Sequence, residues 1–230
     1  MRRKNAWTTY NKKQLDELEK LCKNYLKFLD KGKTERECVK QIVKQAEEKG
    51  YVNLADITKD KKALKAGDKV YSVCMDKTVA LFQIGKKKLE KGMNILGAHI
   101  DSPRMDVKQN PLYESEEFVY LDTHYYGGIK KYQWVTLPLA LHGVVVKKDG
   151  TVITVNVGED KNDPVFCVTD LLIHLAGEQM EKKANKVIEG ENLDVLVGSK
   201  PLEGKEKDAV KEGILEILKE KYDMTEEDFM

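Results

Sequence analysis

The feature that most constrains the fold is the run "MNILGAHI" at residues 93–100, which stays apolar without alternating. A strand with one solvated face alternates apolar and polar residues, whereas a strand covered on both faces is a continuous apolar run. The run therefore predicts a central strand of an α/β sheet. His99 and Asp101 come at its carboxyl end, where catalytic and ligand-binding groups gather in open α/β sheets.

The residues before this run predict two helices. Apolar residues recur every three or four positions over residues 12–29, which is typical of an amphipathic helix. Thr34 followed by Glu37 fits a capping box at the start of a second helix. Gly50 occupies the position of that helix's C-terminal cap, because glycine adopts the left-handed backbone found there.

Short β-rich runs make up much of the remaining chain. The runs at 70–75 and 78–85 flank Asp76-Lys77 and predict an antiparallel hairpin. Residues 105–165 contain further short β-like runs, punctuated by Gly-Gly and Asp-Gly pairs, and predict antiparallel strands with hairpin turns. The pattern of predicted elements changes near residue 105, from helices and a central strand to short β-like runs. This order is expected for an α/β sheet with one long insertion after a core strand.

Apolar periodicity predicts two helices after these strands. One spans about residues 169–188, and a final helix spans about residues 206–222 with Ile217 among its inward residues. Between them, residues 197–207 have the composition of an exposed loop.

Composition excludes some functions and favours a cytoplasmic protein. Forty Lys and Arg residues balance 39 Asp and Glu residues, which gives a net charge of +1 and no field to attract nucleic acid or an anionic membrane. No run approaches the roughly 18 apolar residues of a membrane span, and the basic start lacks the apolar segment of a secretory signal. The four cysteines form no C-x-x-C pair and are expected to be reduced and mostly buried.

His99 and Asp101 have a specific chemical use together. Side chains two apart in a strand share a face, about 6.6 Å apart along the chain. A metal-bound imidazole usually donates its other N–H to a carboxylate, which fixes the tautomer, so the pair fits a metal ligand with its orienting partner. A neutral histidine bonded to a nearby aspartate is also a common structural arrangement. The spacing leaves both interpretations open.

Three segments carry a family resemblance: "ILGAHIDSPR" at 95–104, "HYYGGIKKYQW" at 124–134 and "TDLLIHL" at 169–175. Their order and spacing resemble the M18 family of metallo-aminopeptidases, the relatives of aspartyl aminopeptidase, over essentially the whole chain. The resemblance implies a cytoplasmic aminopeptidase that hydrolyses N-terminal residues from peptides by water activated at two zinc ions, or at other divalent metals.

The resemblance also implies an architecture and an assembly. Residues 1–104 would form the first part of a phosphorylase/hydrolase-like zinc-peptidase α/β domain. Residues 105–224 would form an inserted antiparallel-β and helix dimerisation domain, and residues 225–230 would begin the return to the peptidase domain. Dimers of such proteins build a tetrahedral dodecamer. Peptide substrates and further copies of the chain are therefore the expected partners.

By resemblance, three residues have roles in the active site. His99 would bind one metal and Asp101 would orient it. His174 matches a histidine of the inserted domain that reaches a neighbouring subunit's active site, where it helps to bind substrate and to stabilise the oxyanion. Without the resemblance, the position of His174 between Leu171 and Leu175 on a predicted helix indicates an ordinary, partly inward histidine.

Part of the family's machinery has no match in this sequence. The further metal ligands and the glutamate general base lie downstream of the inserted domain, and a catalytic zinc takes about three protein ligands. The chain supplies one by resemblance, so it is expected to be an incomplete portion that is inactive alone. Two alternatives are a non-catalytic assembly module of such a peptidase and a generic α/β binding protein in which His99–Asp101 is structural. After Gly127-Gly128 the sequence departs from the family pattern, which leaves the preferred N-terminal residue open.

Overall fold

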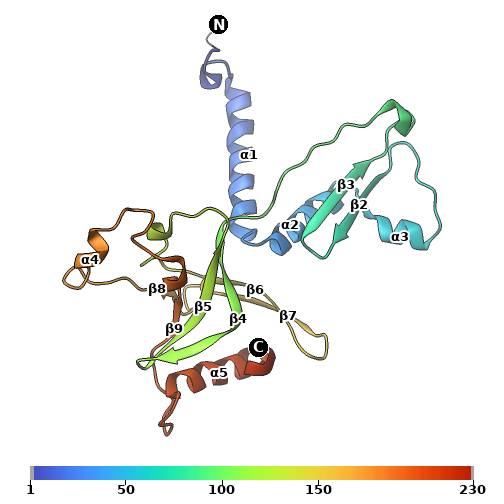
Figure 1. The fold of residues 1–230 in the computed structure, drawn as a ribbon. Coiled ribbons are helices and arrows are strands. Elements are labelled where there is room, and N and C mark those ends of the chain that lie inside the picture. The colour runs from blue at the N-terminus through green and yellow to red at the C-terminus, as the bar shows by residue number, and fades with distance from the viewer. Residues whose placement is uncertain (1–2, 229–230) are drawn as a thin grey trace. The chain divides into compact units, whose positions relative to one another are not determined.

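The computed structural model describes residues 3–228 (Figure 1). Contacts divide the chain into two compact units, unit 1 up to Ser102 and unit 2 from Pro103 onwards. Both units combine helices with sheets, as the predicted α/β class requires. The assignment of 1–104, 105–224 and 225–230 to domains of the family stays a prediction, and residues 229–230 of the last segment lie outside the described residues. No helix among residues 3–228 is long and apolar enough to cross a membrane.

The sheet of unit 1 has three strands in the order β1-β2-β3 within the described residues. β2 pairs in parallel with β1 and antiparallel with β3, which confirms the predicted hairpin across Asp76-Lys77. The elements of unit 1 are α1 (Lys12–Lys31), α2 (Glu35–Glu48), β1 (Val52–Asn53), α3 (Leu54–Lys59), β2 (Lys69–Cys74) and β3 (Thr78–Gln83).

Local signals in the sequence define the ends of the helices. The predicted capping box is present at α2: Thr34 Oγ1 accepts the Glu37 N–H at 3.3 Å, and Glu37 Oε2 accepts the Thr34 N–H at 2.9 Å. Gly50 follows α2 with φ +82°, the left-handed conformation that favours glycine. Asn11 and Gln14 form a second capping box at α1, which was not predicted from the sequence.

The core of unit 1 lies between α2 and β2. Val70 and Tyr71 of β2 are buried together with Cys38 and Val39 of α2. The Tyr71 hydroxyl donates to Glu47 Oε1 at 2.7 Å, and this hydrogen bond raises the pKa of Tyr71. The prediction of mostly buried cysteines is wrong, because two of the four are exposed: Cys22 and Cys74.

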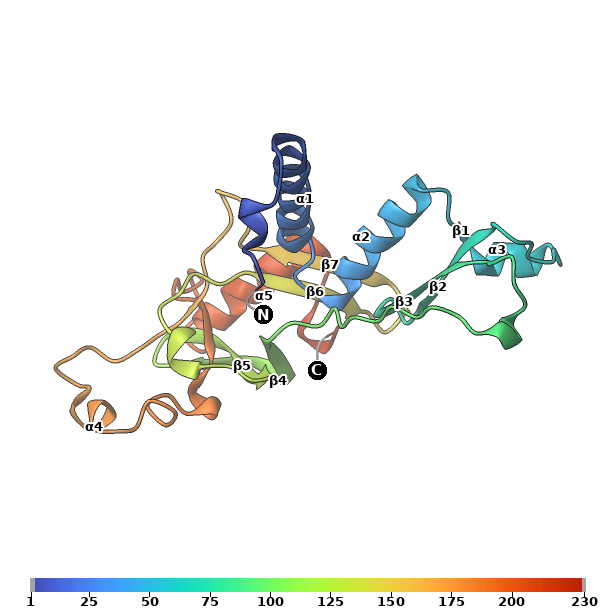
Figure 2. The same ribbon diagram turned by 90° about the horizontal axis from the view of Figure 1, so that it is seen from above.

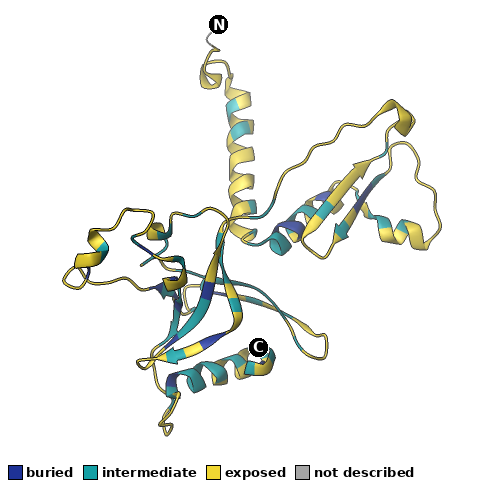
Figure 3. Cartoon of the chain, viewed as in Figure 1, coloured by how far each residue is buried: buried dark blue, intermediate teal, exposed yellow. Residues whose placement is uncertain are grey.

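Helix α1 is amphipathic, but none of its residues is buried. Figure 3 shows it coloured as exposed along most of its length. The apolar positions include Leu21, which is 65% exposed, and Tyr25 and Leu26, each 59% exposed. The predicted helix at 12–29 is therefore confirmed, while the apolar stripe that predicted it has no covering layer among residues 3–228.

The predicted central strand at 93–100 is wrong for this structure. These residues form neither helix nor strand, and Leu96 is fully exposed, with Ile95 at 79%. A β-strand exists only when a neighbouring strand accepts and donates its backbone hydrogen bonds. No strand among residues 3–228 pairs with this run.

Unit 2 contains a four-stranded sheet of order β4-β5-β9-β8 and a two-stranded sheet of β6 and β7 within its described residues. β6 and β7 run side by side in both views (Figures 1 and 2). Their antiparallel pairing, with Leu141 opposite Val157 and Val146 opposite Val152, confirms the predicted hairpin across Asp149-Gly150. The elements are β4 (Arg104–Ser115), β5 (Phe118–Tyr126), β6 (Leu141–Val146), β7 (Val152–Val157), β8 (Cys167–Val168), α4 (Gly177–Met180), β9 (Val195–Gly198) and α5 (Ala209–Tyr222).

The core of unit 2 is centred on β9 and the residues before it. Leu193 is 0% exposed and packs in a cluster with Val168, Val195 and Phe166. The buried Thr123 hydroxyl donates to the Leu193 carbonyl at 2.5 Å. This bond satisfies a polar group that would be costly to bury unpaired, and it ties β5 to the start of β9.

The predicted helix at 169–188 is also wrong. Only α4, at Gly177–Met180, is helical there, and four apolar residues before it are exposed: Leu171, Leu172, Ile173 and Leu175. Most helical stability in proteins comes from packing an apolar face, and this stripe has no surface to pack on. Instead, Asp170 Oδ1 accepts the Leu171 N–H at 2.8 Å and the Gln179 side-chain amide at 2.9 Å, which holds residues 170–179 as a closed loop.

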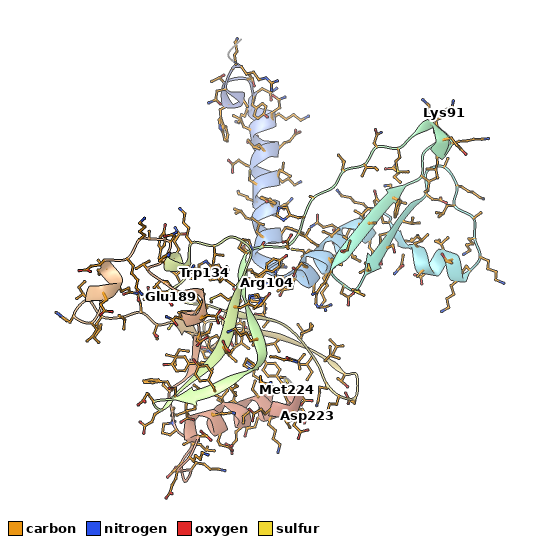
Figure 4. All side chains as sticks on the ribbon, in the orientation of Figure 1. Lys91, Arg104, Trp134, Glu189, Asp223 and Met224 are labelled. Atoms are coloured by element: carbon orange, nitrogen blue, oxygen red, sulfur yellow. The ribbon has the colours of Figure 1, made fainter. Side chains whose placement is uncertain are left out.

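The predicted C-terminal helix is confirmed as α5, which packs on β4, β5 and β9. Val210 is buried, but Ile217, predicted to face inward, is 56% exposed. Asp223 and Met224, labelled in Figure 4, follow α5, and Met224 is buried. Lys147 Nζ donates to the carbonyl oxygen of Asp223 at 2.6 Å and to the Asp223 carboxylate at 2.9 Å. The side-chain bond raises the pKa of Lys147.

Asp163 gives unit 2 an acid-sensitive contact. Its Oδ2 accepts the Gly158 N–H at 2.8 Å and the Asp160 N–H at 3.2 Å, and these bonds lower the pKa of Asp163 below its ordinary value of 3.8. Because the folded-state pKa is depressed, the stabilisation is present above pH 3.8 and is lost as the pH falls through the folded-state value. We expect Asp163→Asn to lower the thermal midpoint at pH 7 and to flatten its dependence on pH below 4.

Thermal unfolding measured from pH 7 to pH 3 tests this prediction. Asp160→Asn is the matched control, because it keeps the backbone N–H that Asp163 accepts. An acid dependence of Asp163→Asn identical to that of the wild type would contradict the assigned role.

Candidate functional site

The His99–Asp101 pair forms a local contact in unit 1. His99 Nδ1 lies 3.1 Å from the Asp101 carboxylate oxygen Oδ1 and 3.1 Å from the Asp101 carbonyl oxygen. With the proton on Nδ1, the imidazole donates to Asp101 and Nε2 presents its lone pair. The His99 side chain is 85% exposed and that of Asp101 is 39% exposed, so Nε2 is accessible to a ligand.

The sequence predicted the contact between these residues but not its setting. The two side chains meet, as the i and i+2 spacing predicts, yet they meet in a segment without strand structure. The Asp101 carboxylate therefore orients the His99 imidazole by a local hydrogen bond, and the pairing of strands in a sheet does not contribute. The metal-ligand role of His99 and the orienting role of Asp101 stay predictions.

Arg104 ends the motif that contains this pair and begins β4 of unit 2. Its Nε donates to Asp106 Oδ1 at 2.7 Å, and its guanidinium lies 4.3 Å from the centroid of the Tyr126 ring, a cation–π distance (Figure 4). Both contacts lie within the β4–β5 pair. These two contacts hold the Arg104 side chain against β4 and β5, where unit 2 begins.

His174 lies in the closed loop of unit 2 and is exposed. The alternative of a partly inward, packed histidine is wrong, because the helix on which it depended does not form. Its neighbours Ile173 and Leu175 are 67% and 70% exposed. The catalytic role of His174 stays a prediction.

Two groups of polar side chains in unit 2 were not identified from the sequence. His142 Nε2 lies 3.0 Å from Glu159 Oε1, and the His142 side chain is only 10% exposed. Lys108 Nζ lies 2.9 Å from carboxylate oxygens of both Asp122 and Glu191, and these hydrogen bonds raise the pKa of Lys108. The partners are far apart in sequence, so only the strand pairing reveals them.

The donor set of the described residues fits one corner of a metal site. His99 offers an imidazole nitrogen whose other ring nitrogen is held by a carboxylate, as a metal-bound histidine requires. Among residues 3–228, no group of three His, Cys, Asp or Glu side chains is placed to hold a metal ion. A complete catalytic zinc site therefore needs ligands beyond those gathered here.

These features define an α/β chain that carries a ligand-like histidine and its orienting carboxylate. Residues 28–230 match a family model described as aminopeptidase I zinc metalloprotease (M18). The chain belongs to this M18 family of zinc metalloproteases, which confirms the resemblance drawn from the three sequence segments.

Similar proteins include a probable M18 family aminopeptidase 1 of Clostridium acetobutylicum, which is 60% identical over 228 residues, 99% of this chain and 49% of the relative. A crystal structure of an M18 aminopeptidase from Thermotoga maritima matches all of this chain and 49% of its own, with a TM-score of 0.91 and 45% identity. The structure of aminopeptidase I from Clostridium acetobutylicum has a TM-score of 0.86 and 58% identity, over all of this chain and 51% of its own. The chain spans about half the length of the curated relatives it matches.

Proposed function

We propose that this chain is part of a zinc-dependent aminopeptidase that hydrolyses N-terminal residues from peptides. The observation that carries the proposal is the 3.1 Å contact between His99 Nδ1 and the Asp101 carboxylate, found in a chain that matches the zinc metalloprotease family over residues 28–230. The reaction belongs to the polypeptide that contains the whole active site, since the similar proteins are about twice as long as this chain.

In this proposal each residue has one role. Asp101 holds the proton at His99 Nδ1 and so keeps the Nε2 lone pair directed at a metal ion. Zinc, in a two-metal site and replaceable by other divalent ions, supplies Lewis-acid chemistry when bound. His174, exposed in the loop of unit 2, assists substrate binding and oxyanion stabilisation in the active site of a neighbouring copy.

The proposal includes an assembly and a location. The apolar side chains around His174, namely Leu171, Leu172, Ile173 and Leu175, are exposed in this chain and fit an interface between copies. In this proposal the chain dimerises through residues 105–224. The dimers assemble into a tetrahedral dodecamer, and the protein is located in the cytoplasm.

The aminopeptidase activity is tested with the polypeptide purified from native cells. The intact mass of this polypeptide establishes its length. We expect it to release N-terminal residues from unblocked peptides, to lose this activity with EDTA and to regain it with zinc. An N-acetylated peptide of the same sequence is the control, because an aminopeptidase requires the free amino group. Cleavage that persists in EDTA, or equal cleavage of the acetylated peptide, would refute the proposal.

A non-catalytic assembly module is the second candidate function. It is favoured by the lack of a three-ligand metal group among residues 3–228. In that case the purified 230-residue chain dimerises and releases no amino acids with added zinc, cobalt or manganese. Turnover by the purified chain would exclude this function.

A further inference from the structure

Charge is distributed unequally between the two units. Unit 1, up to Ser102, has 24 Lys and Arg residues and 14 Asp and Glu residues, a formal charge of +10. Unit 2 has 16 Lys and Arg residues and 25 Asp and Glu residues, a formal charge of −9. The expectation of no attraction to an anionic membrane rested on the charge of the whole chain. Because charges are screened beyond about 8 Å at physiological ionic strength, a partner responds to the local charge instead.

Two loops of unit 1 are rich in lysine and lie side by side. One loop, residues 60–68, precedes β2, and the other, residues 84–91, follows β3. The Gly67 N–H donates to the Ile84 carbonyl at 2.8 Å, and the Ile84 N–H donates to the Asp68 carbonyl at 2.9 Å. The two loops therefore form one end of this sheet, as Figure 1 shows.

The lysines of these loops are mostly not neutralised by neighbouring carboxylates. The two loops contain seven lysines and three acidic residues, and all seven lysines are exposed. Within residues 3–228, one of the seven has an ion-pair partner: Lys62 Nζ lies 2.8 Å from Asp60 Oδ2. The Asp68 carboxylate accepts the Lys65 backbone N–H at 2.7 Å. We call the following residues, together with Leu64 and Leu89, the lysine surface: Lys61, Lys62, Lys65, Lys86, Lys87, Lys88 and Lys91, the last labelled in Figure 4.

Each loop also exposes a leucine that has lysines on both sides in the sequence. Leu64 in "KKALK" is 37% exposed, and Leu89 in "KKKLEK" is 74% exposed. Lysines beside exposed apolar side chains are typical of segments that lie at a membrane surface. There the apolar side chain reaches the boundary of the acyl chains, and the lysines extend to the headgroups.

The residue types of the two loops distinguish between classes of anionic partner. Nucleic acids are bound largely through arginine and, where single-stranded, through stacking on aromatic rings, and residues 60–68 and 84–91 contain neither arginine nor an aromatic residue. Lysine is a hydrated point charge on a flexible stem, which suits a diffuse layer of headgroups. The exposed leucines favour a partner with an apolar layer directly beneath its charges, and a bilayer has this structure.

We propose that the lysine surface binds the anionic face of a lipid bilayer as a peripheral contact. The lysines lie among the headgroups, and Leu64 and Leu89 lie at the boundary of the acyl chains. Each lysine near an anionic membrane surface raises the affinity about fivefold, so several together give measurable binding. The cytoplasmic leaflet is the anionic one. The contact depends on the charge and exposure of unit 1 and not on the proposed aminopeptidase activity.

Sedimentation of the purified chain with lipid vesicles tests the proposal. Anionic vesicles contain phosphatidylglycerol and phosphatidylcholine in equal parts, and neutral vesicles contain phosphatidylcholine alone. We expect the chain to bind the anionic vesicles at least about 100-fold more tightly than the neutral ones at low salt. The difference is expected to disappear at about 1 M salt, where the screening length is about 3 Å.

Two variants separate the charges of the lysine surface from its apolar part. The triple variant Lys86→Gln, Lys87→Gln and Lys88→Gln is expected to weaken binding to anionic vesicles about 100-fold. Leu89→Ala is expected to weaken it about tenfold and to leave its salt dependence unchanged, because it removes apolar area and no charge. All four side chains are exposed, so the fold of the chain is retained.

A second triple variant is the matched control. Lys20→Gln, Lys23→Gln and Lys27→Gln together remove the same charge from exposed positions of α1 in the same unit. Because these lysines lie outside the lysine surface, the control is expected to bind anionic vesicles within about threefold of the wild type.

Three results would overturn the proposal: equal binding to neutral and anionic vesicles, equal losses in the two triple variants, or binding that persists at high salt. Tighter binding of single-stranded RNA or polyglutamate than of anionic vesicles would assign the lysine surface to another class of partner and overturn the bilayer. None of these measurements uses a peptide substrate, so an inactive polypeptide that still binds vesicles would refute only the proposed aminopeptidase.

Discussion

Replacing His99 by alanine is expected to lower kcat/KM of the complete polypeptide at least about 1,000-fold and to reduce its zinc content. A catalytic zinc has about three protein ligands, and the Lewis acid is worth several kcal/mol of transition-state stabilisation. Each 1.36 kcal/mol corresponds to a factor of about ten in rate. Steady-state kinetics with an unblocked peptide and metal analysis of the purified variant measure the two effects.

Two further variants separate a metal role from a structural one. Asp101→Asn keeps the size of the side chain and is expected to cost about 10- to 100-fold in metal affinity or activity, the usual effect of losing an orienting partner. His124→Ala removes another exposed histidine, whose Nδ1 lies 3.0 Å from the neighbouring Tyr125 carbonyl oxygen, and should retain both zinc and activity. Full zinc content and activity in His99→Ala would remove His99 from the site.

Replacing Leu193 by alanine is expected to lower the free energy of unfolding of unit 2 by about 2–5 kcal/mol. Leu193 is completely buried, and its neighbours include Val168 and Val195. Truncation removes its transfer free energy and leaves a cavity at the centre of the cluster. Urea denaturation followed by the fluorescence of Trp134, which packs against this cluster, measures the loss.

Leu172→Ala is the matched control for this measurement. It makes the same truncation in unit 2 at a residue that is 71% exposed, so the expected change for the monomeric chain, measured at low protein concentration, is within about 0.5 kcal/mol. Equal effects of the two variants would show that Leu193 does not carry the stability of the core.

The features predicted correctly from the sequence are those set by near neighbours. The capping box of Thr34 and Glu37 and the hairpins across Asp76-Lys77 and Asp149-Gly150 depend on a few adjacent residues. Their backbone preferences act within one turn, whatever lies further along the chain. The prediction of helix α5 was also correct, because its apolar residues pack on the sheet of the same unit.

The two wrong predictions of secondary structure share a physical cause. A continuous apolar run at 93–100 and an apolar stripe at 169–188 indicate elements that are stable only when other surfaces cover them. Within residues 3–228 those surfaces are absent, and the side chains of Leu96 and Leu172 are exposed. Pattern alone reports what a segment can bury, and it does not report whether a partner is present.

The candidate site was predictable to the same extent. The contact of His99 with Asp101 follows from a separation of two residues, which is visible in the sequence. The contact of His142 with Glu159 depends on the pairing of β6 with β7, in which His142 lies opposite Asn156. That register was not predicted, so this pair could not be identified in advance.

The bond between Asp170 and Gln179 has a consequence for the free energy of the proposed association between copies of the chain. Residues 170–179 are already closed into a loop by this bond, although most of their apolar side chains are exposed. A segment that is ordered before an encounter loses less conformational entropy when it is buried. In the proposed assembly, Asp170 and Gln179 would thus lower the entropy cost of burying this segment, without contributing to the apolar surface that a partner covers.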